Sequence, residues 1–108
     1  MSRKVQDGVI RIYRPGDVHG EVRELIPFKK LQELVGGYVQ IVRVSEKLAI
    51  ACDEDGKLKS YLPTLKVSIP FGSMVFCGTI VVGNFGNSGM KPVKESEFIK
   101  FDSIVERL

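Results

Sequence analysis

The chain has 108 residues, of which 44% are hydrophobic, and 16 basic against 13 acidic side chains give a formal net charge of +3. This length suits one domain, and the apolar fraction excludes a chain that is disordered throughout. No apolar stretch approaches the ~18 residues of a membrane-spanning helix, and the small positive charge excludes an acidic surface that imitates DNA.

The start of the chain and its cysteines point to one compartment. The first residues, MSRKVQDG, contain no apolar segment of the kind found in signal peptides. Cys52 and Cys77 each lie in an apolar run, and a small secreted domain would carry more cysteines. We therefore expect a single cytoplasmic domain over residues 1–108 with buried, free thiols. Because so small a domain buries limited surface, we also expect a homo-oligomer.

The first half of the chain contains a strand, an ambiguous segment and a helix. Residues 9–13 alternate, with Ile10 and Ile12 on one face and Arg11 and Tyr13 on the other, which predicts a strand. Residues 21–27 alternate again and fit either a second short strand or an extended approach to the helix. The helix follows from apolar residues at helical spacing, and Gly36 is expected to cap it in a left-handed conformation; these residues are Phe28, Leu31, Leu34 and Val35.

Residues 38–62 predict a three-stranded meander. Ser45–Lys47 form the expected first hairpin loop, and the sequence DEDG at 53–56 forms the second. A calcium loop would need more oxygen ligands over a longer register, so we interpret DEDG as a turn.

The second half predicts a buried strand and a final helix. Residues 64–74 have no clean period and fit a crossover or an irregular edge, whereas the apolar run 75–83 predicts a central strand buried on both faces, with Gly78 marking a bulge or a close approach. Near the C-terminus an amphipathic helix is expected, with Ser96 as its N-cap; its apolar stripe comprises Phe98, Phe101, Val105 and Leu108. The predicted fold class is α+β, a mainly antiparallel sheet of about five strands with a short central helix and a C-terminal amphipathic helix.

Catalytic and metal-binding sets are not evident in the sequence. His19 is the one histidine, and two cysteines 25 residues apart with one histidine do not match a zinc site. Phosphate-binding, hydrolase and metalloprotease motifs are missing, and no carboxylate pair stands out as an acid–base couple. We therefore expect a binding protein without cofactor or enzymatic activity.

One segment has the composition of an anion-binding loop. In residues 81–91, VVGNFGNSGMK, three glycines spaced by three residues follow a strand, and Asn87, Ser88 and Lys91 add hydrogen-bond donors. The spacing matches no dinucleotide fingerprint, so a hairpin tip without a ligand is the alternative. Single-stranded nucleic acid binding is a further alternative, since Arg11, Tyr13 and Arg14 would lie together on a basic strand.

The junction LQELVGGY at residues 31–38 resembles a family of short proteins of unknown function from bacteriophages and bacterial mobile elements. Its further marks are the turn DEDGKLKSYLP and the segment Cys77–Val82, so that the resemblance covers residues 28–83. Thr64 departs from the family, in which asparagine follows the leucine–proline pair. The resemblance implies a phage or mobile-element origin and a single small domain, and it transfers no functional residue.

Small phage proteins of this kind act on host proteins or on the nucleotide signals of host defence. The leading hypothesis is sequestration of a small anionic, nucleotide-like ligand in the host cytoplasm, and the alternative is inhibition of a host protein through a sheet edge or the C-terminal helix. At the junction itself, Gly36 and Gly37 cap the helix, while Tyr38 either packs or lines a groove. The candidate ligand-binding residues are Arg11, Arg14, Tyr38, Arg43, Asn87, Ser88 and Lys91.

Overall fold

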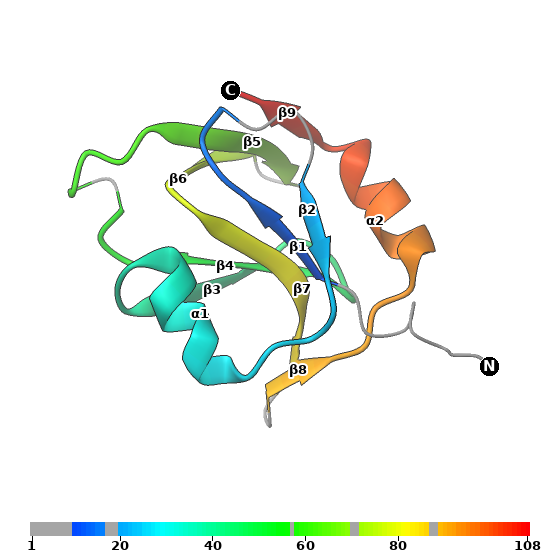
Figure 1. Cartoon of the computed structure of the whole chain (residues 1–108). Helices are drawn as coiled ribbons and strands as arrows, with labels where there is room; N and C mark the ends of the chain where they lie inside the picture. The colour runs from blue at the N-terminus through cyan, green and yellow to red at the C-terminus, as the bar shows by residue number, and fades with distance from the viewer. Residues whose placement is uncertain (1–9, 17–19, 57, 70–71, 87–88) are drawn as a thin grey trace.

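The computed structural model describes residues 10–16, 20–56, 58–69, 72–86 and 89–108. These residues form two helices, α1 (Phe28–Val35) and α2 (Glu95–Asp102), together with nine strands (Figure 1). The strands are β1 (Ile10–Tyr13), β2 (Glu21–Arg23), β3 (Val39–Arg43), β4 (Ala49–Asp53), β5 (Pro63–Ile69), β6 (Gly72–Cys77), β7 (Ile80–Gly86), β8 (Gly89–Lys91) and β9 (Val105–Arg107). The α+β class with a mainly antiparallel sheet is confirmed.

The main sheet has the order β2-β1-β7-β4-β3, and β8 extends it as the second strand of a hairpin with β7. Every neighbouring pair is antiparallel. Strand β7 lies in the middle, with Val81 paired to Ile12 on one side and to Ala51 on the other. Its residues Val82 and Val81 are buried in the two cores on opposite faces of the sheet, which explains the apolar sequence of the strand.

Helix α1 covers one face of the main sheet. Its buried residues Leu31 and Val35 are four positions apart, one helical turn, and Leu31 packs with Ile12 and Val81 of the sheet. The helix ends as predicted, because Gly36 has φ +89° and its N–H donates to Gln32 O. At two turns the helix depends on this packing for its stability.

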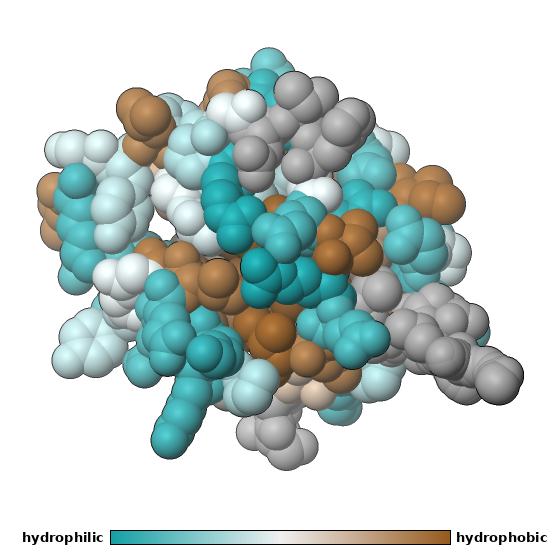
Figure 2. All heavy atoms as spheres, viewed as in Figure 1, coloured by the Kyte–Doolittle hydropathy of each residue, from teal (hydrophilic) through white to brown (hydrophobic). Residues whose placement is uncertain are grey.

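A second sheet of order β6-β5-β9 and helix α2 cover the other face. In Figure 1 the second sheet and α2 lie on a different side of the main sheet from α1. The core between them joins Ile50 and Val82 of the main sheet to Leu65 of β5 and Phe98 of α2. Full burial of a side chain such as Phe98 stabilises the fold by roughly 1.5–3 kcal/mol. On the face shown in Figure 2, hydrophobic side chains gather near the lower centre, with hydrophilic side chains around and partly over them.

The prediction of a three-stranded meander over residues 38–62 is wrong in its third strand. Strands β3 and β4 pair around the loop Ser45–Lys47 as predicted, but residues 54–56 and 58–60 form turns. The Asp53 carboxylate accepts the N–H of Asp55 at 2.8 Å and so directs the chain out of β4 into a turn.

The prediction of one strand over residues 75–83 is also wrong. The chain breaks at Gly78, which has φ +78°, and the two halves enter different sheets as β6 and β7. Position 78 requires glycine because a Cβ there would lie 2.5 Å from the Tyr61 ring. Of residues 64–74, which lack a clean period, 64–69 and 72–74 belong to β5 and β6 of the second sheet, which the sequence did not predict. Cys52 and Cys77 form no disulfide with each other, and Cys52 is buried as predicted, but Cys77 at the end of β6 is only half-buried.

The C-terminal helix is shorter than predicted. Helix α2 begins after Lys94, not after Ser96, and ends at Asp102. Beyond it, β9 pairs with the edge of β5 and places Arg107 opposite Leu65. The spacing of the apolar residues fitted a longer helix, but backbone pairing with β5 satisfies hydrogen bonds that the edge would otherwise leave open.

Candidate functional site

A basic cleft lies between the β3–β4 loop, the β7–β8 hairpin and the start of α2. Its volume is about 740 Å³, within the range of small-molecule sites. The lining residues are Arg43, Glu46, Lys47, Asn84, Phe85, Lys91, Pro92, Val93, Lys94, Ser96 and Glu97. Two regions far apart in the sequence, the β3–β4 loop and the stretch from β7 to the start of α2, therefore contribute to one hollow, which we call the basic cleft.

The basic cleft carries an excess of positive charge. Four of its side chains are basic and two, Glu46 and Glu97, are acidic. Within the part of the chain that the structure describes, none of the four basic side chains forms a salt bridge. Their mutual repulsion is relieved by solvent and salt or by a bound anion.

Arg43 holds the two hairpins of the cleft together. Its Nη1 donates to Glu46 O at 3.0 Å and to Ser45 O at 3.4 Å, and its Nη2 donates to Phe85 O at 3.0 Å. All three acceptors are backbone carbonyls, so the guanidinium is fixed in place while its charge is not cancelled. A fixed cation loses little side-chain entropy when a ligand binds.

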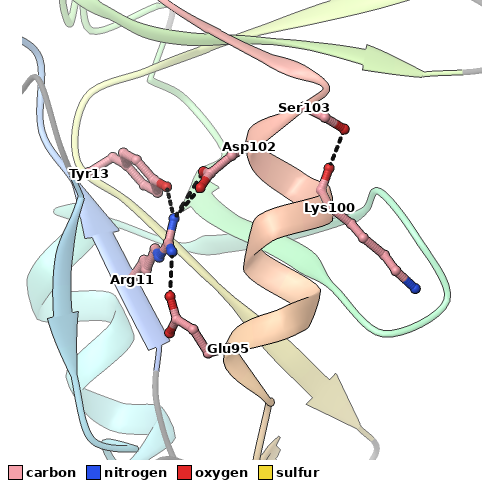
Figure 3. A network of polar contacts seen from close by, with 6 residues as sticks. All are labelled: Arg11, Tyr13, Glu95, Lys100, Asp102 and Ser103. Carbon is pink, nitrogen blue, oxygen red and sulfur yellow. Dashed lines mark hydrogen bonds and ion pairs between the residues drawn. The ribbon is translucent and has the colours of Figure 1, made fainter.

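The acidic residues of α2 are divided between the cleft and an internal network. Glu95 accepts a hydrogen bond from Arg11 Nη2 at 2.9 Å, and Asp102 accepts two from Arg11 Nη1 at 2.9 and 3.1 Å (Figure 3). Glu97, in contrast, lines the basic cleft. Arg11 therefore removes two carboxylates of α2 from competition for the cations of the cleft.

The network around Arg11 explains why this predicted ligand residue is not in the cleft. Its guanidinium lies 4.6 Å from the Phe98 ring centroid and donates to Tyr13 Oη at 3.3 Å, and its side chain is 12% exposed. Burial alone would lower the pKa of Arg11, but hydrogen bonds to Tyr13, Asp102 and Glu95 outweigh it and raise the pKa. Arg11 attaches α2 to β1. Tyr13 is fully buried, so the expected exposed face of Arg11 and Tyr13 does not exist.

The other predicted site residues are dispersed. Arg14 donates to Glu21 at 2.7 Å beside β2, away from the cleft. Tyr38 is 73% exposed, so the interpretation that it packs is wrong, and it lies at the opposite end of β3 from Arg43. Asn87 and Ser88 lie outside the described residues. Of the predicted site residues that the structure describes, Arg43 and Lys91 alone line this cleft.

A second polar cluster explains the paired glycines of the helix–strand junction. The buried Asp53 accepts hydrogen bonds from Lys59 Nζ at 2.8 Å and Tyr61 Oη at 3.2 Å. A Cβ at Gly37 would lie 2.8 Å from both the Asp53 carboxylate and Lys59 Nζ, and one at Gly36 would lie 3.0 Å from Tyr61 Oη. The glycines therefore let the junction close over this cluster, which ties the segment after β4 to α1.

The ionisation of this cluster supports a structural role. Burial alone would raise the pKa of Asp53, but hydrogen bonds from Lys59, the Asp55 amide and Tyr61 outweigh it and lower the pKa. The hydrogen bond to Asp53 raises the pKa of Lys59. Lys59 is thus held as a protonated cation, which is unsuited to act as a nucleophile.

Sequence reasoning missed Lys47, Asn84, Lys94 and Ser96 as cleft residues. Lys47 follows Glu46 in a short hairpin loop, where a solvated charge is usual. The segment Lys91–Lys94 offered a cue, because two lysines flank Pro92 and Val93 next to the glycine loop. Only the packing of β8 and α2 beside the β3–β4 loop makes these charges neighbours.

Comparison with known proteins gives a family without an assigned activity. A family model described as "Domain of unknown function (DUF3846)" matches residues 10–102. No curated protein and no solved structure matches the chain. Among the described residues, neither helix has the length and apolar character needed to cross a membrane.

Proposed function

Because the chain belongs to the DUF3846 family, whose description names no activity, we propose a function from the basic cleft: the protein binds a small anionic, nucleotide-like ligand. The observation that carries this proposal is the set of four cationic side chains around one hollow of about 740 Å³, none in a salt bridge with a described carboxylate. A phosphate-bearing ligand would supply the missing negative charge.

The chemistry of the cleft favours phosphate over a carboxylate of similar size. Arg43 is fixed by three carbonyls, whereas Lys47, Lys91 and Lys94 are exposed and have flexible stems. Lysine ammonium groups act as point charges that adapt to several phosphate oxygens, while the fixed guanidinium sets the position of the anion. Asn84 and Ser96 add neutral donors at the same hollow.

We propose binding without turnover. The described residues that line the cleft include neither histidine nor cysteine, and its two acids, Glu46 and Glu97, stand among four basic side chains. Such a site can hold a phosphate ester, but it offers no evident nucleophile or acid–base pair. Incubation of the bound nucleotide with the protein, followed by chromatography, checks this: recovery of an altered nucleotide at catalytic protein concentration would contradict it.

In biological terms we propose an accessory protein of a phage or mobile element that sequesters a nucleotide signal of host defence in the host cytoplasm. The support is the resemblance of residues 28–83 to such proteins, together with the anion-binding chemistry of the cleft. Sequestration requires tight binding and not catalysis, which fits a site built from cations.

A thermal-shift screen of the full chain tests the ligand proposal. The probes are inorganic pyrophosphate and the linear and cyclic ribonucleotides, each at low salt. A ligand present at 100 times its Kd stabilises the folded state by about 2.7 kcal/mol, which raises the Tm of a domain this size by several degrees. If no probe raises the Tm, the proposal is contradicted.

A specific observation favours self-association as a second function. Strand β6 lies at the edge of the second sheet, and its sequence, GSMVFC, carries no charged side chain. Natural edge strands of this length usually carry a charge or a proline that prevents pairing with another chain. We propose that β6 pairs antiparallel with β6 of a second copy, an arrangement that places no like charges opposite one another.

Single-stranded nucleic acid binding loses its main support. The basic strand proposed as its platform has Tyr13 buried and Arg11 engaged with α2. Likewise, Phe98 and Phe101 are buried inside the fold and do not form an exposed stripe for a host protein.

A further inference from the structure

A second hollow adjoins the basic cleft on the other side of the β3–β4 loop. Its volume is about 590 Å³, and it lies between that loop and the second half of α2. Glu46, Lys47 and Glu97 line both hollows, so the two meet at these residues. The residues of the second hollow, which we call the apolar hollow, are Val44, Ser45, Glu46, Lys47, Leu48, Glu97, Lys100, Phe101, Ser103 and Ile104.

The floor of this hollow is hydrophobic. The half-buried Val44 and Ile104 line the hollow and pack against the core that contains Leu48 and Phe101, each of which is only 2% exposed. Such a floor offers a flat group dispersion contacts and a place to leave water. An aromatic ring is the group that gains most from a surface of this kind.

The rim of the hollow is polar but balanced in charge. Lys47 and Lys100 are matched by Glu46 and Glu97, whereas the basic cleft has an excess of two positive charges. Figure 3 shows Lys100 extending from α2 on the side away from Arg11. A second phosphate would therefore gain little here, and a neutral group is favoured.

Two hydroxyls on the rim can read the edge of such a ring. Ser45 Oγ accepts the N–H of Leu48 at 3.2 Å and retains its own hydrogen to donate. Ser103 Oγ donates to Lys100 O at 2.7 Å and retains lone pairs to accept. One donor and one acceptor suit a heteroaromatic base, whose edge carries both kinds of group.

Helix α2 sets the distance between the two hollows. Lys94, its N-cap, lines the basic cleft, and Phe101, seven residues later, lines the apolar hollow. At 1.5 Å per residue these positions are about 10 Å apart along the axis. This distance is comparable to the length of one nucleotide from its phosphate to the far edge of its base.

We infer that the apolar hollow binds the base of the ligand whose phosphate occupies the basic cleft, so that the ligand spans the two hollows across Glu46 and Lys47. This inference rests on the proposed function. It adds that affinity depends on a neutral planar base as well as on phosphate, and that a sugar phosphate without a base occupies only half of the site.

Calorimetric titration of the full chain with ribose 5-phosphate and with the four ribonucleoside monophosphates tests this. We expect at least one nucleotide to bind ten times more tightly than ribose 5-phosphate. Equal affinities for ribose 5-phosphate and all four nucleotides would overturn the inference while leaving the proposed function standing. Failure of all five probes to bind would contradict both.

Two matched variants, one at the C-cap of α2 and one within the helix, show where the base of the nucleotide binds. Ser103→Trp fills the apolar hollow from an exposed position, whereas Ile99→Trp places the same ring on an exposed residue that lines neither hollow. We expect Ser103→Trp to reduce nucleotide affinity tenfold, to the level of ribose 5-phosphate, and Ile99→Trp to leave it unchanged. Equal weakening of ribose 5-phosphate and nucleotide by Ser103→Trp would overturn the inference. If Ser103→Trp does not fold, the comparison of ligands on the unmodified chain decides alone.

Discussion

Gly37 lies directly against the carboxylate of Asp53: a Cβ added at position 37 would be 2.8 Å from Asp53 Oδ2. The contact joins the segment just after α1 to the last residue of β4. It shows that the paired glycines primarily serve packing, since they make room for a buried carboxylate and the lysine and tyrosine that bind it.

Gly37→Ala is expected to destabilise the fold by about 1–3 kcal/mol, because the added methyl displaces a buried, hydrogen-bonded carboxylate. Urea unfolding of Gly37→Ala, Asp53→Ala and the double variant measures the coupling. We expect each substitution to lower the free energy of unfolding less when the other substitution is already present. Strictly additive effects would show that the two residues do not compete for space.

The stability of the fold should fall in acid partly through Asp53. Its pKa is lowered in the folded state, so its contribution is present above the pKa of the unfolded chain and is lost as pH falls through the folded-state pKa. Between pH 7 and pH 3, Asp53→Asn should therefore lose less stability than the unmodified chain does. Glu106 is exposed, so Glu106→Gln serves as the control and should lose as much stability between pH 7 and pH 3 as the unmodified chain. An equally large loss for Asp53→Asn would contradict the account.

Arg11 should not be replaceable by lysine. Its guanidinium bridges Glu95 and Asp102, two carboxylates seven residues apart on α2, and also stacks over Phe98. A single ammonium cannot reproduce this fork, so both Arg11→Lys and Arg11→Met should destabilise the fold by about 1–3 kcal/mol. Urea unfolding that finds Arg11→Lys as stable as the unmodified chain would contradict this role.

Self-association through β6 has a variant that opposes the dimer without harming the monomer. Val75 lies opposite Lys66 of β5, so Val75→Glu gains a cross-strand charge pair within one chain and places a charge on the edge. Light scattering should find a dimer for the unmodified chain and for the neutral Val75→Thr, and a monomer for Val75→Glu. A dimer that survives Val75→Glu, or a monomer in all three, would rule out pairing at this edge.

Local patterns in the sequence predicted much of the fold. The helix over residues 28–35, its glycine cap and the hairpin at Ser45–Lys47 depend on spacing and turn residues, and all three are confirmed. The break at Gly78 and the strand β9 depend on contacts with Tyr61 and β5, which are distant in sequence. The apolar run 75–83 fits one long strand or two shorter ones equally well, and the apolar spacing after α2 fits a longer helix or a strand equally well. Tertiary pairing decides between these structures.

The candidate site was less predictable than the fold. Arg43 and Lys91 were identified as ligand residues, and they do line one cleft. The charge of Arg11 favours a ligand residue, but its carboxylate partners on α2 lie more than eighty residues away in the sequence. Lys47 and Lys94 were missed because a lysine in a loop has no distinguishing pattern until folding brings several together.

The most direct test of the basic cleft is a calorimetric titration with inorganic pyrophosphate of three proteins: the unmodified chain, Lys91→Gln/Lys94→Gln, and Lys29→Gln/Lys66→Gln. The last pair removes the same charge from exposed lysines that do not line the cleft. We expect binding to the unmodified chain and to Lys29→Gln/Lys66→Gln, and affinity at least ten times weaker for Lys91→Gln/Lys94→Gln. No binding to the unmodified chain, or equal losses in the two double variants, would contradict the assignment of the cleft as an anion site.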